Sequence, residues 1–194
     1  MRARLVVESG RWEEMKGQGS FDNVDELFAL GISSARLGDV ARAEAALDHL
    51  QNATKAAPDA TNRQLAEIMA GEVAALIHLA RGQGAEATAA AARAAMLESG
   101  MPRPIARPYP IKPAGELYAE VLTDTGDPAA AVRQFRAALE RTPRRAACLI
   151  GLVRAAHRAG LHEEAAQAAR EFLGMWHAAD ADRPELRDAQ ALVR

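Results

Sequence analysis

Two histidines close together in the last third of the chain are the first residues whose chemistry would suit a site. His157 and His162 flank Gly160, and Glu163 and Glu164 follow them. Two imidazoles and a carboxylate are a ligand set that zinc accepts. Their spacing crosses a turn, however, and no HExxH motif or Cys/His cluster accompanies them. We interpret these histidines as solvated turn residues and expect no metal or other cofactor.

The sequence offers no activated nucleophile. The single cysteine, Cys148, lies in the apolar run 146–153 with no activating base nearby, which is typical of a small core residue. Ser33 and Ser34 fall within a helical pattern and lack the Gly-x-Ser-x-Gly turn of a hydrolase. The GQG at 82–84 has the form of a hairpin turn rather than a phosphate-binding loop. We therefore expect no catalytic residues and a protein that is not an enzyme.

The elements that position these residues are predicted to be helices. Ala, Leu, Arg and Glu dominate, whereas aromatic residues make up only 4% and β-branched residues are scarce, so the composition favours an all-α fold. The formal net charge of -2 indicates no global attraction to nucleic acid or anionic lipid. No apolar stretch approaches the ~18 residues of a membrane span. We expect a soluble protein without nucleic-acid or membrane partners.

Glycines divide the helical pattern at regular intervals. A glycine in the left-handed conformation commonly ends a helix, and an aspartate after it can cap the next helix. Aligning the chain on these glycines places an alanine five residues later in every copy, which lets paired helices approach closely. The four glycines are Gly38, Gly82, Gly126 and Gly160, and the four alanines are Ala43, Ala87, Ala131 and Ala165.

This pattern resembles the tetratricopeptide repeat (TPR), a helical hairpin of 34 residues. The best-matching copy carries Tyr118-Ala119, Gly126-Asp127, Ala131, Phe135, Ala138 and Pro143, and Gly126 and Gly160 are 34 residues apart. The two earlier glycine spacings are each 44 residues. A long helix beginning near a Thr61/Gln64 capping box accounts for part of the excess, and a proline-rich connector at 101–112 accounts for the rest.

We expect a single TPR-like domain over 1–194, an α-α superhelix of about four to five hairpins with a C-terminal capping helix. Its parts are a partial hairpin at 1–20, repeats at about 21–58, 59–101, 113–143 and 144–178, and a cap at 182–194. The helices are expected at 1–9, 12–18, 23–37, 40–56, 62–81, 84–99, 113–125, 128–141, 143–159 and 162–177, followed by a short one to about 193. Tyr109 and Ile111 of the connector are expected to pack against the helices.

From about Pro108 onward the sequence is also similar to the C-terminal end of longer bacterial repeat proteins, many of them exported. The matching parts are the proline-rich stretch before Lys112-Pro113, the Gly126-Asp127 hairpin and the Asp-Arg-Pro-Glu-Leu segment from Asp182. The first residues, 1–8, are too short and too quickly charged for a secretory signal, so we expect a cytoplasmic location for the chain as written. The resemblance implies a periplasmic or secreted location if the chain is a fragment of such an exported protein.

The TPR resemblance also predicts which residues line a concave groove, because the first helix of each hairpin faces it. The first two repeats would present a mainly apolar groove that suits an amphipathic helix or a neighbouring domain. The Lys/Asn clamp by which family members bind chaperone tails is absent. The predicted groove residues are Phe28, Ile32, Glu72, Leu76, Glu116, Glu120, Asp124, Ile150, Arg154, His157 and Arg158.

Seven arginines and one acid lie between Arg133 and Arg158, and this local charge has two interpretations. One is a basic patch for an acidic peptide or polyanion. The other is a set of ion pairs between neighbouring repeats, since Glu120 and Arg154 are 34 residues apart, as are Asp124 and Arg158. The favoured function is a scaffold that binds a peptide or protein partner in the groove. The alternative is a structural or self-associating segment, including a homo-oligomer, with no separate ligand.

Overall fold

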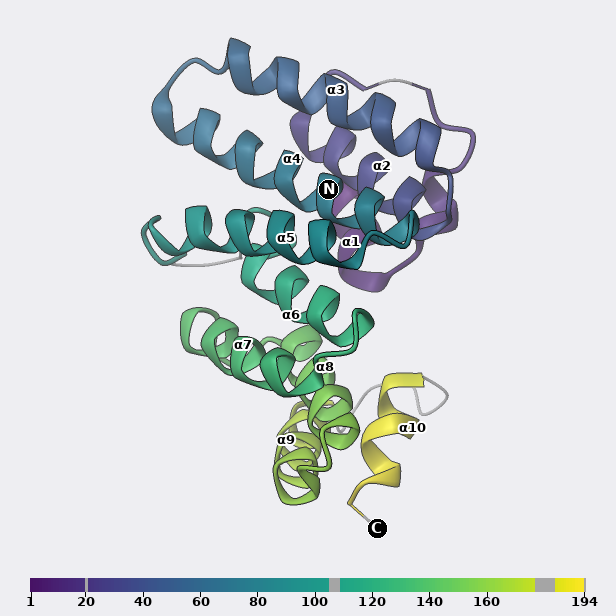
Figure 1. Ribbon diagram of the computed structural model, residues 1–194, viewed down its shortest axis with the longest axis vertical. Helices are drawn as coiled ribbons and strands as arrows, with labels where there is room; N and C mark the ends of the chain where they lie inside the picture. The colour runs from purple at the N-terminus through teal and green to yellow at the C-terminus, as the bar shows by residue number, and fades with distance from the viewer. Residues whose placement is uncertain (20, 105–108, 177–183, 194) are drawn as a thin grey trace.

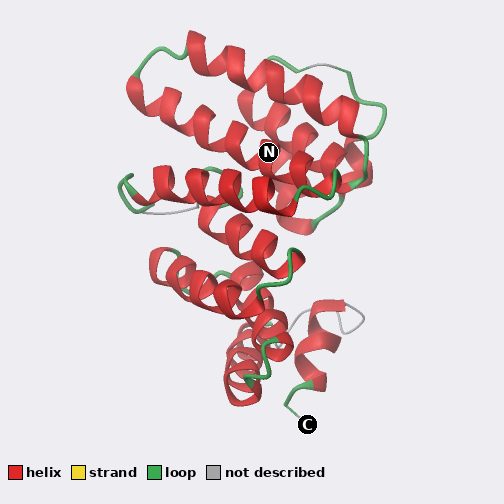
Figure 2. Ribbon diagram, viewed as in Figure 1, coloured by secondary structure: helices red, strands yellow, loops and turns green. Residues whose placement is uncertain are grey.

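The computed structural model describes residues 1–19, 21–104, 109–176 and 184–193, and this part of the chain contains helices but no strand (Figures 1 and 2). The expected all-α, TPR-like stack is confirmed: α2–α3, α4–α5, α6–α7 and α8–α9 are hairpins that pack in chain order. The elements are α1 (Arg2–Ser9), the 3₁₀ turn η1 (Trp12–Met15), α2 (Val24–Arg36), α3 (Val40–Ala56), α4 (Ala60–Ala80), α5 (Gly84–Ser99), α6 (Ala114–Asp124), α7 (Pro128–Arg141), α8 (Ala146–Arg158), α9 (His162–Met175) and α10 (Pro184–Ala191).

The hairpin turns have the caps that the repeat pattern predicts. Gly38 and Gly126 adopt φ angles of 79° and 90°, in the left-handed region that side chains rarely adopt. The following aspartates accept hydrogen bonds from the first turn of the next helix: Asp39 from Arg42 N at 3.2 Å and Asp127 from Ala130 N at 2.9 Å. The α2–α3 and α6–α7 turns are therefore capped by local contacts, whereas the first residues before α5 and α9, Gln83 and Leu161, provide no side-chain cap.

The predicted capping box of the long helix α4 is wrong in its residues. Asp59 caps α4 by accepting from Asn62 N at 2.8 Å, and its other oxygen accepts from the Asn62 side chain at 2.7 Å. Gln64 does not reach back to the helix start, because its side chain donates to Leu97 O at the end of α5 at 3.1 Å. The glutamine thus ties the two helices of one hairpin together.

Small residues bring neighbouring helices into close contact, as the repeat offsets predict. Ala43, Ala87, Ala131 and Ala165 are all fully buried. At two points even an alanine would not fit: a Cβ at Gly31 would lie 2.8 Å from Val73, and one at Gly151 would lie 2.3 Å from the Phe135 ring. The side chain of the facing helix occupies that space, which explains a glycine inside a helix.

The face built from the first helices of the hairpins (α2, α4, α6 and α8), called the inner face below, is not an open groove at its N-terminal end. Phe28, Ile32, Glu72 and Leu76 are each at most 2% exposed. Val6, Val7 and Met15 of the N-terminal segment and Ile111 of the connector belong to the same hydrophobic cluster as Phe28 and Leu76. The open apolar groove expected in the first two repeats is therefore absent, because the chain itself covers it.

The connector and the C-terminal helix are the remaining parts of the chain outside the hairpins. Ile111 is buried as expected, whereas Tyr109 is 42% exposed. The C-terminal helix α10 packs on α8 and α9 through Leu186 and Ala189, both buried, at the end of the stack. Residues 105–108 of the predicted connector and 182–183 and 194 of the predicted cap lie outside the described residues.

Candidate functional site: a cleft on the inner face

A cleft of about 740 Å³ lies on the inner face, lined by residues of α2, α6 and α8. Three first helices contribute its walls, and the end of the N-terminal segment closes one side. It is called the inner cleft below. Its lining includes Glu8 and Trp12 from the N-terminal segment, Ile32 and Arg36 from α2, Lys112, Glu116, Glu120, Thr123 and Asp124 from the connector end and α6, Arg145, Ile150, Arg154 and Arg158 at or on α8, and Trp176 after α9.

Seven of the predicted groove residues meet in this cleft. They are Ile32, Glu116, Glu120, Asp124, Ile150, Arg154 and Arg158. The other four do not line it. Phe28, Glu72 and Leu76 are buried at the N-terminal end of the inner face, and His157 is exposed on α8 outside the lining.

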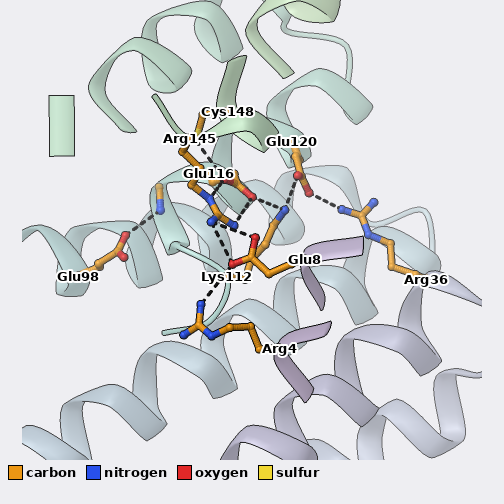
Figure 3. A network of polar contacts seen from close by, with 10 residues as sticks. Arg4, Glu8, Arg36, Glu98, Lys112, Glu116, Glu120, Arg145 and Cys148 are labelled. Carbon is orange, nitrogen blue, oxygen red and sulfur yellow. Dashed lines mark hydrogen bonds and ion pairs between the residues drawn. The ribbon is translucent and has the colours of Figure 1, made fainter. Parts of the chain in front are cut away.

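A buried ionic cluster forms the floor of the inner cleft (Figure 3). Glu116, which is fully buried, lies 2.6 Å from Lys112 Nζ and pairs with the guanidinium of Arg145. The thiol of Cys148 donates to Glu116 Oε2 at 3.0 Å. Arg145 also pairs with Glu8 of α1 at 3.1 Å, so the cluster connects the start of the chain to α8.

Neighbouring opposite charges stabilise the ionised forms of the buried acid and lysine in this floor. Burial alone would raise the pKa of Glu116, but Lys112 and Arg145 outweigh burial and lower the pKa to about 2. Burial likewise opposes the charge on Lys112, and the carboxylates of Glu116 and Glu120 overcome it, so the Lys112 pKa is raised. For Cys148, burial first and then the nearby Glu116 charge raise the thiol pKa, which leaves an unreactive thiol. The floor therefore consists of fixed, compensated charges.

A second layer of ion pairs connects α2 to α6 above the floor. Arg36 lies 2.7 Å from Glu120 and 3.4 Å from Asp124, and Lys112 lies 2.5 Å from the other oxygen of Glu120. These groups are partly exposed, with the Arg36 side chain at 25%. Glu120 and Asp124, the two carboxylates of α6 above the floor, are thus already paired with Arg36 of α2.

The predicted pairs Glu120–Arg154 and Asp124–Arg158 are wrong. Glu120 and Asp124 pair with Arg36 of α2 instead. Arg154 pairs forward along the stack with Asp188 of α10 at 2.7 Å, which is again a separation of 34 residues. Arg158 donates to Thr123 O at 3.4 Å. The 34-residue spacing therefore indicated which helices lie next to each other, but not which residues form ion pairs.

Other arginines of the basic stretch are also engaged. Arg136 pairs with Glu164 at 2.5 Å, and Arg141 donates to the carbonyls of Met101 and Pro102 at 2.9 and 3.1 Å. Arg133 donates to Ala129 O at 3.2 Å and lies exposed on α7. The stretch is therefore not one continuous basic patch. Its exposed cations at the inner cleft are Arg154 and Arg158, one helical turn apart on α8.

Glu72, predicted to face the groove, is instead a buried carboxyl group for which the described chain provides no hydrogen-bond partner at either oxygen. Burial, followed by the charge of Glu98, raises its pKa well above the usual range. Glu98 differs because it accepts a hydrogen bond from Gly115 N at 3.0 Å, although burial still raises its pKa. Burial therefore favours the neutral form of the Glu72 carboxyl group inside the stack.

Of the candidate chemical residues singled out from the sequence, the two histidines lie near each other at the turn between α8 and α9. His157 and His162 face each other edge to face, with ring centroids 5.9 Å apart. In the residues that the structure covers, no group of three or more His, Cys, Asp or Glu side chains is placed to hold a metal ion. Within the same residues, no helix has both the length and the apolar character that crossing a membrane requires.

The sequence did not identify Glu8, Arg36, Lys112 and Arg145, which form the ion pairs that connect the walls of the inner cleft. One signal was available: Lys112 precedes Glu116 by four residues and Glu120 by eight, so a lysine next to a helix start could reach both acids. The pairing of Glu8 with Arg145 joins residues 137 positions apart and has no local signal.

Comparison with known proteins gives one structural likeness of note. The crystal structure of the P58(IPK) TPR domain is similar to this chain with a TM-score of 0.48 and 16% sequence identity, and the match covers 99% of this chain and 54% of that one. The chain thus spans about half the length of that solved structure. No protein-family model and no curated protein matches the sequence.

Proposed function

We propose that this protein is a protein-interaction module whose inner cleft holds an acidic peptide segment of a partner. TPR-like folds generally mediate contacts between proteins, and a helical stack presents its first helices to such a ligand. The proposed ligand carries a carboxylate close to an apolar side chain. The cleft offers Arg154 and Arg158 for the carboxylate, and Ile150 and Trp12 of the same lining for the apolar side chain.

One observation carries the proposal: exposed arginines stand above a floor whose charges are already compensated. Arg158 has no ion pair among the described residues and holds a carbonyl at 3.4 Å, longer than a strong charge-assisted hydrogen bond. Arg154 already binds a carboxylate, that of Asp188, with both partners 46% exposed. An incoming carboxylate would find two guanidinium groups and would not have to disrupt the buried Glu116 cluster.

Selection from a random peptide display library tests this proposal with the full-length chain as bait. We expect binders enriched in Asp or Glu next to an apolar residue. The R154A/R158A double variant should bind them at least tenfold more weakly, since hydrogen bonds to charged groups contribute about 1.5–3 kcal/mol each. Arg133→Ala, which removes an exposed arginine outside the cleft, is the matched control. Binders without acidic residues, or equal loss in both variants, would overturn the proposal.

The oligomeric state provides an independent check. Light scattering coupled to size exclusion at two concentrations and two salt levels should show a monomer with the cleft accessible. A stable dimer whose formation R154A/R158A abolishes would mean that a second copy occupies the cleft. The self-associating role would then replace the proposed one.

A further inference from the structure

The N-terminal segment, residues 1–19, packs on the inner face as an amphipathic helix packs into a groove. The side chains of α1 at positions 3, 6 and 7 are buried, a spacing that places them on one side of a helix. Leu5, between them, points away and is 51% exposed, while Val6 is fully buried. Together with Met15, this apolar side joins the cluster that contains Phe28 and Leu76.

Many of the polar bonds of this segment are internal to it. Arg2 donates to Gln18 Oε1 at 3.2 Å and to Glu14 O at 2.8 Å, and Arg4 pairs with Glu8 at 3.2 Å. Such bonds persist when a segment moves as a unit. The bond from Glu8 to Arg145 at 3.1 Å instead connects the segment to α8, and it is partly exposed.

The segment is also joined to α2 through a glycine turn. Gly17 adopts a φ angle of 66°, and a Cβ there would have no neighbour within 4 Å. An eight-residue helix has little stability of its own, so α1 keeps its helical form through contact with the inner face. The turn is contacted at Gln18 O, which accepts a hydrogen bond from the Arg42 side chain of α3. A short helix that packs through one apolar side only, next to a glycine turn, has the features of a unit that opens before the rest of a domain.

We infer that α1 and η1 are a built-in, displaceable occupant of a helix-binding site on α2, at the hydrophobic cluster that α2 shares with α4, and that a partner helix of the same pattern takes their place. The partner's pattern follows from α1: small or β-branched apolar residues at i, i+3 and i+4, with an acid at i+5 that reaches Arg145. This goes beyond the proposed function, since it concerns the part of the inner face that α1 and η1 cover, although Glu8 and Trp12 of this segment also line one side of the inner cleft.

Hydrogen exchange of the full-length chain tests whether the segment opens separately. Val6→Asp places a charge at the fully buried position and should speed exchange of the α1 amides by roughly a hundredfold, with much smaller changes in α2 and α4. Leu5→Asp is the matched control at the adjacent exposed position and should leave α1 protected. Unchanged α1 exchange in Val6→Asp, or loss of protection in α2 and α4 as large as in α1, would overturn the inference.

A peptide in trans tests whether the uncovered face binds a helix. A labelled peptide of residues 1–16 should bind the Val6→Asp chain at least about tenfold more tightly than the wild-type chain, whose own segment competes for the site. The same peptide carrying Val6→Asp is the control and should not bind. Equal affinity of the native peptide for both chains, or no binding to either, would refute the exchange. Neither result depends on the selection of acidic peptides by Arg154 and Arg158, so the two proposals fail separately.

Discussion

Glu72 should make the protein less stable as pH rises, and replacing it with Gln should remove that dependence. The carboxyl group is fully buried and has no hydrogen-bond partner among the described residues, and burial raises its pKa well above the ordinary value of 4.5. The folded protein therefore keeps a proton that the unfolded chain releases above this value. The stabilisation is fully present below pH 4.5 and is lost as pH rises toward the folded pKa, at about 1.4 kcal/mol per pH unit.

Urea unfolding of wild type and Glu72→Gln at half-unit steps from pH 5 to pH 8 measures this difference directly. The unfolding free energy of the variant minus that of wild type should grow by about 1.4 kcal/mol per pH unit and level off once the folded pKa is passed. Glu67→Gln, at an exposed position on the same helix, controls for the substitution itself. A difference that stays constant across this range would refute the reasoning, because Glu72 would then already be ionised in the folded state.

Three further perturbations follow from contacts within the stack. Gly151→Ala should lower the free energy of unfolding in urea by about 1–3 kcal/mol, since the added Cβ would lie 2.3 Å from Phe135. Gly174→Ala is the comparison: its added Cβ would meet no other side chain within 4 Å, so the free energy of unfolding should stay unchanged or rise by up to about 1 kcal/mol. Glu116, with its pKa lowered to about 2, should contribute stability that is present above pH 4.5 and declines by about 3 kcal/mol as pH falls toward 2. Glu116→Gln should be less stable at neutral pH and should lose this decline of the unfolding free energy at acidic pH. An unchanged decline in the variant would contradict the assignment. Cys148 should resist thiol-exchange reagents at pH 8 when folded and react fully in denaturant, and fast labelling of the folded chain would show that the thiol is not held against Glu116.

The hairpin architecture was predictable because its signals are local. Gly126 ends one helix, Asp127 caps the next, and Ala131 allows close approach, all within six residues. Such short-range chemistry repeats along the chain and can be recognised without knowing the overall fold. The same reasoning failed at the α4 start only by choosing Thr61 over Asp59, two residues earlier.

The composition of the inner cleft was only half predictable. The repeat spacing correctly placed Glu120, Arg154 and Arg158 in one cleft, because equivalent positions of neighbouring repeats are adjacent. It could not show that Arg36 and Lys112 would engage Glu120, since these pairings depend on how the stack curves and where the connector runs. The covering of the inner face by α1 likewise depends on contacts across most of the chain.

A double-mutant cycle between Arg158 and a carboxylate of a selected peptide tests the central claim most directly. Affinities of wild type and Arg158→Ala are measured by calorimetry for the peptide and for its acid-to-amide analogue. The account predicts a coupling energy of about 1–3 kcal/mol, because the carboxylate and guanidinium lose each other in either single change. A coupling energy of zero, with the acidic peptide bound equally well by both proteins, would show that the ligand does not use the inner cleft as proposed.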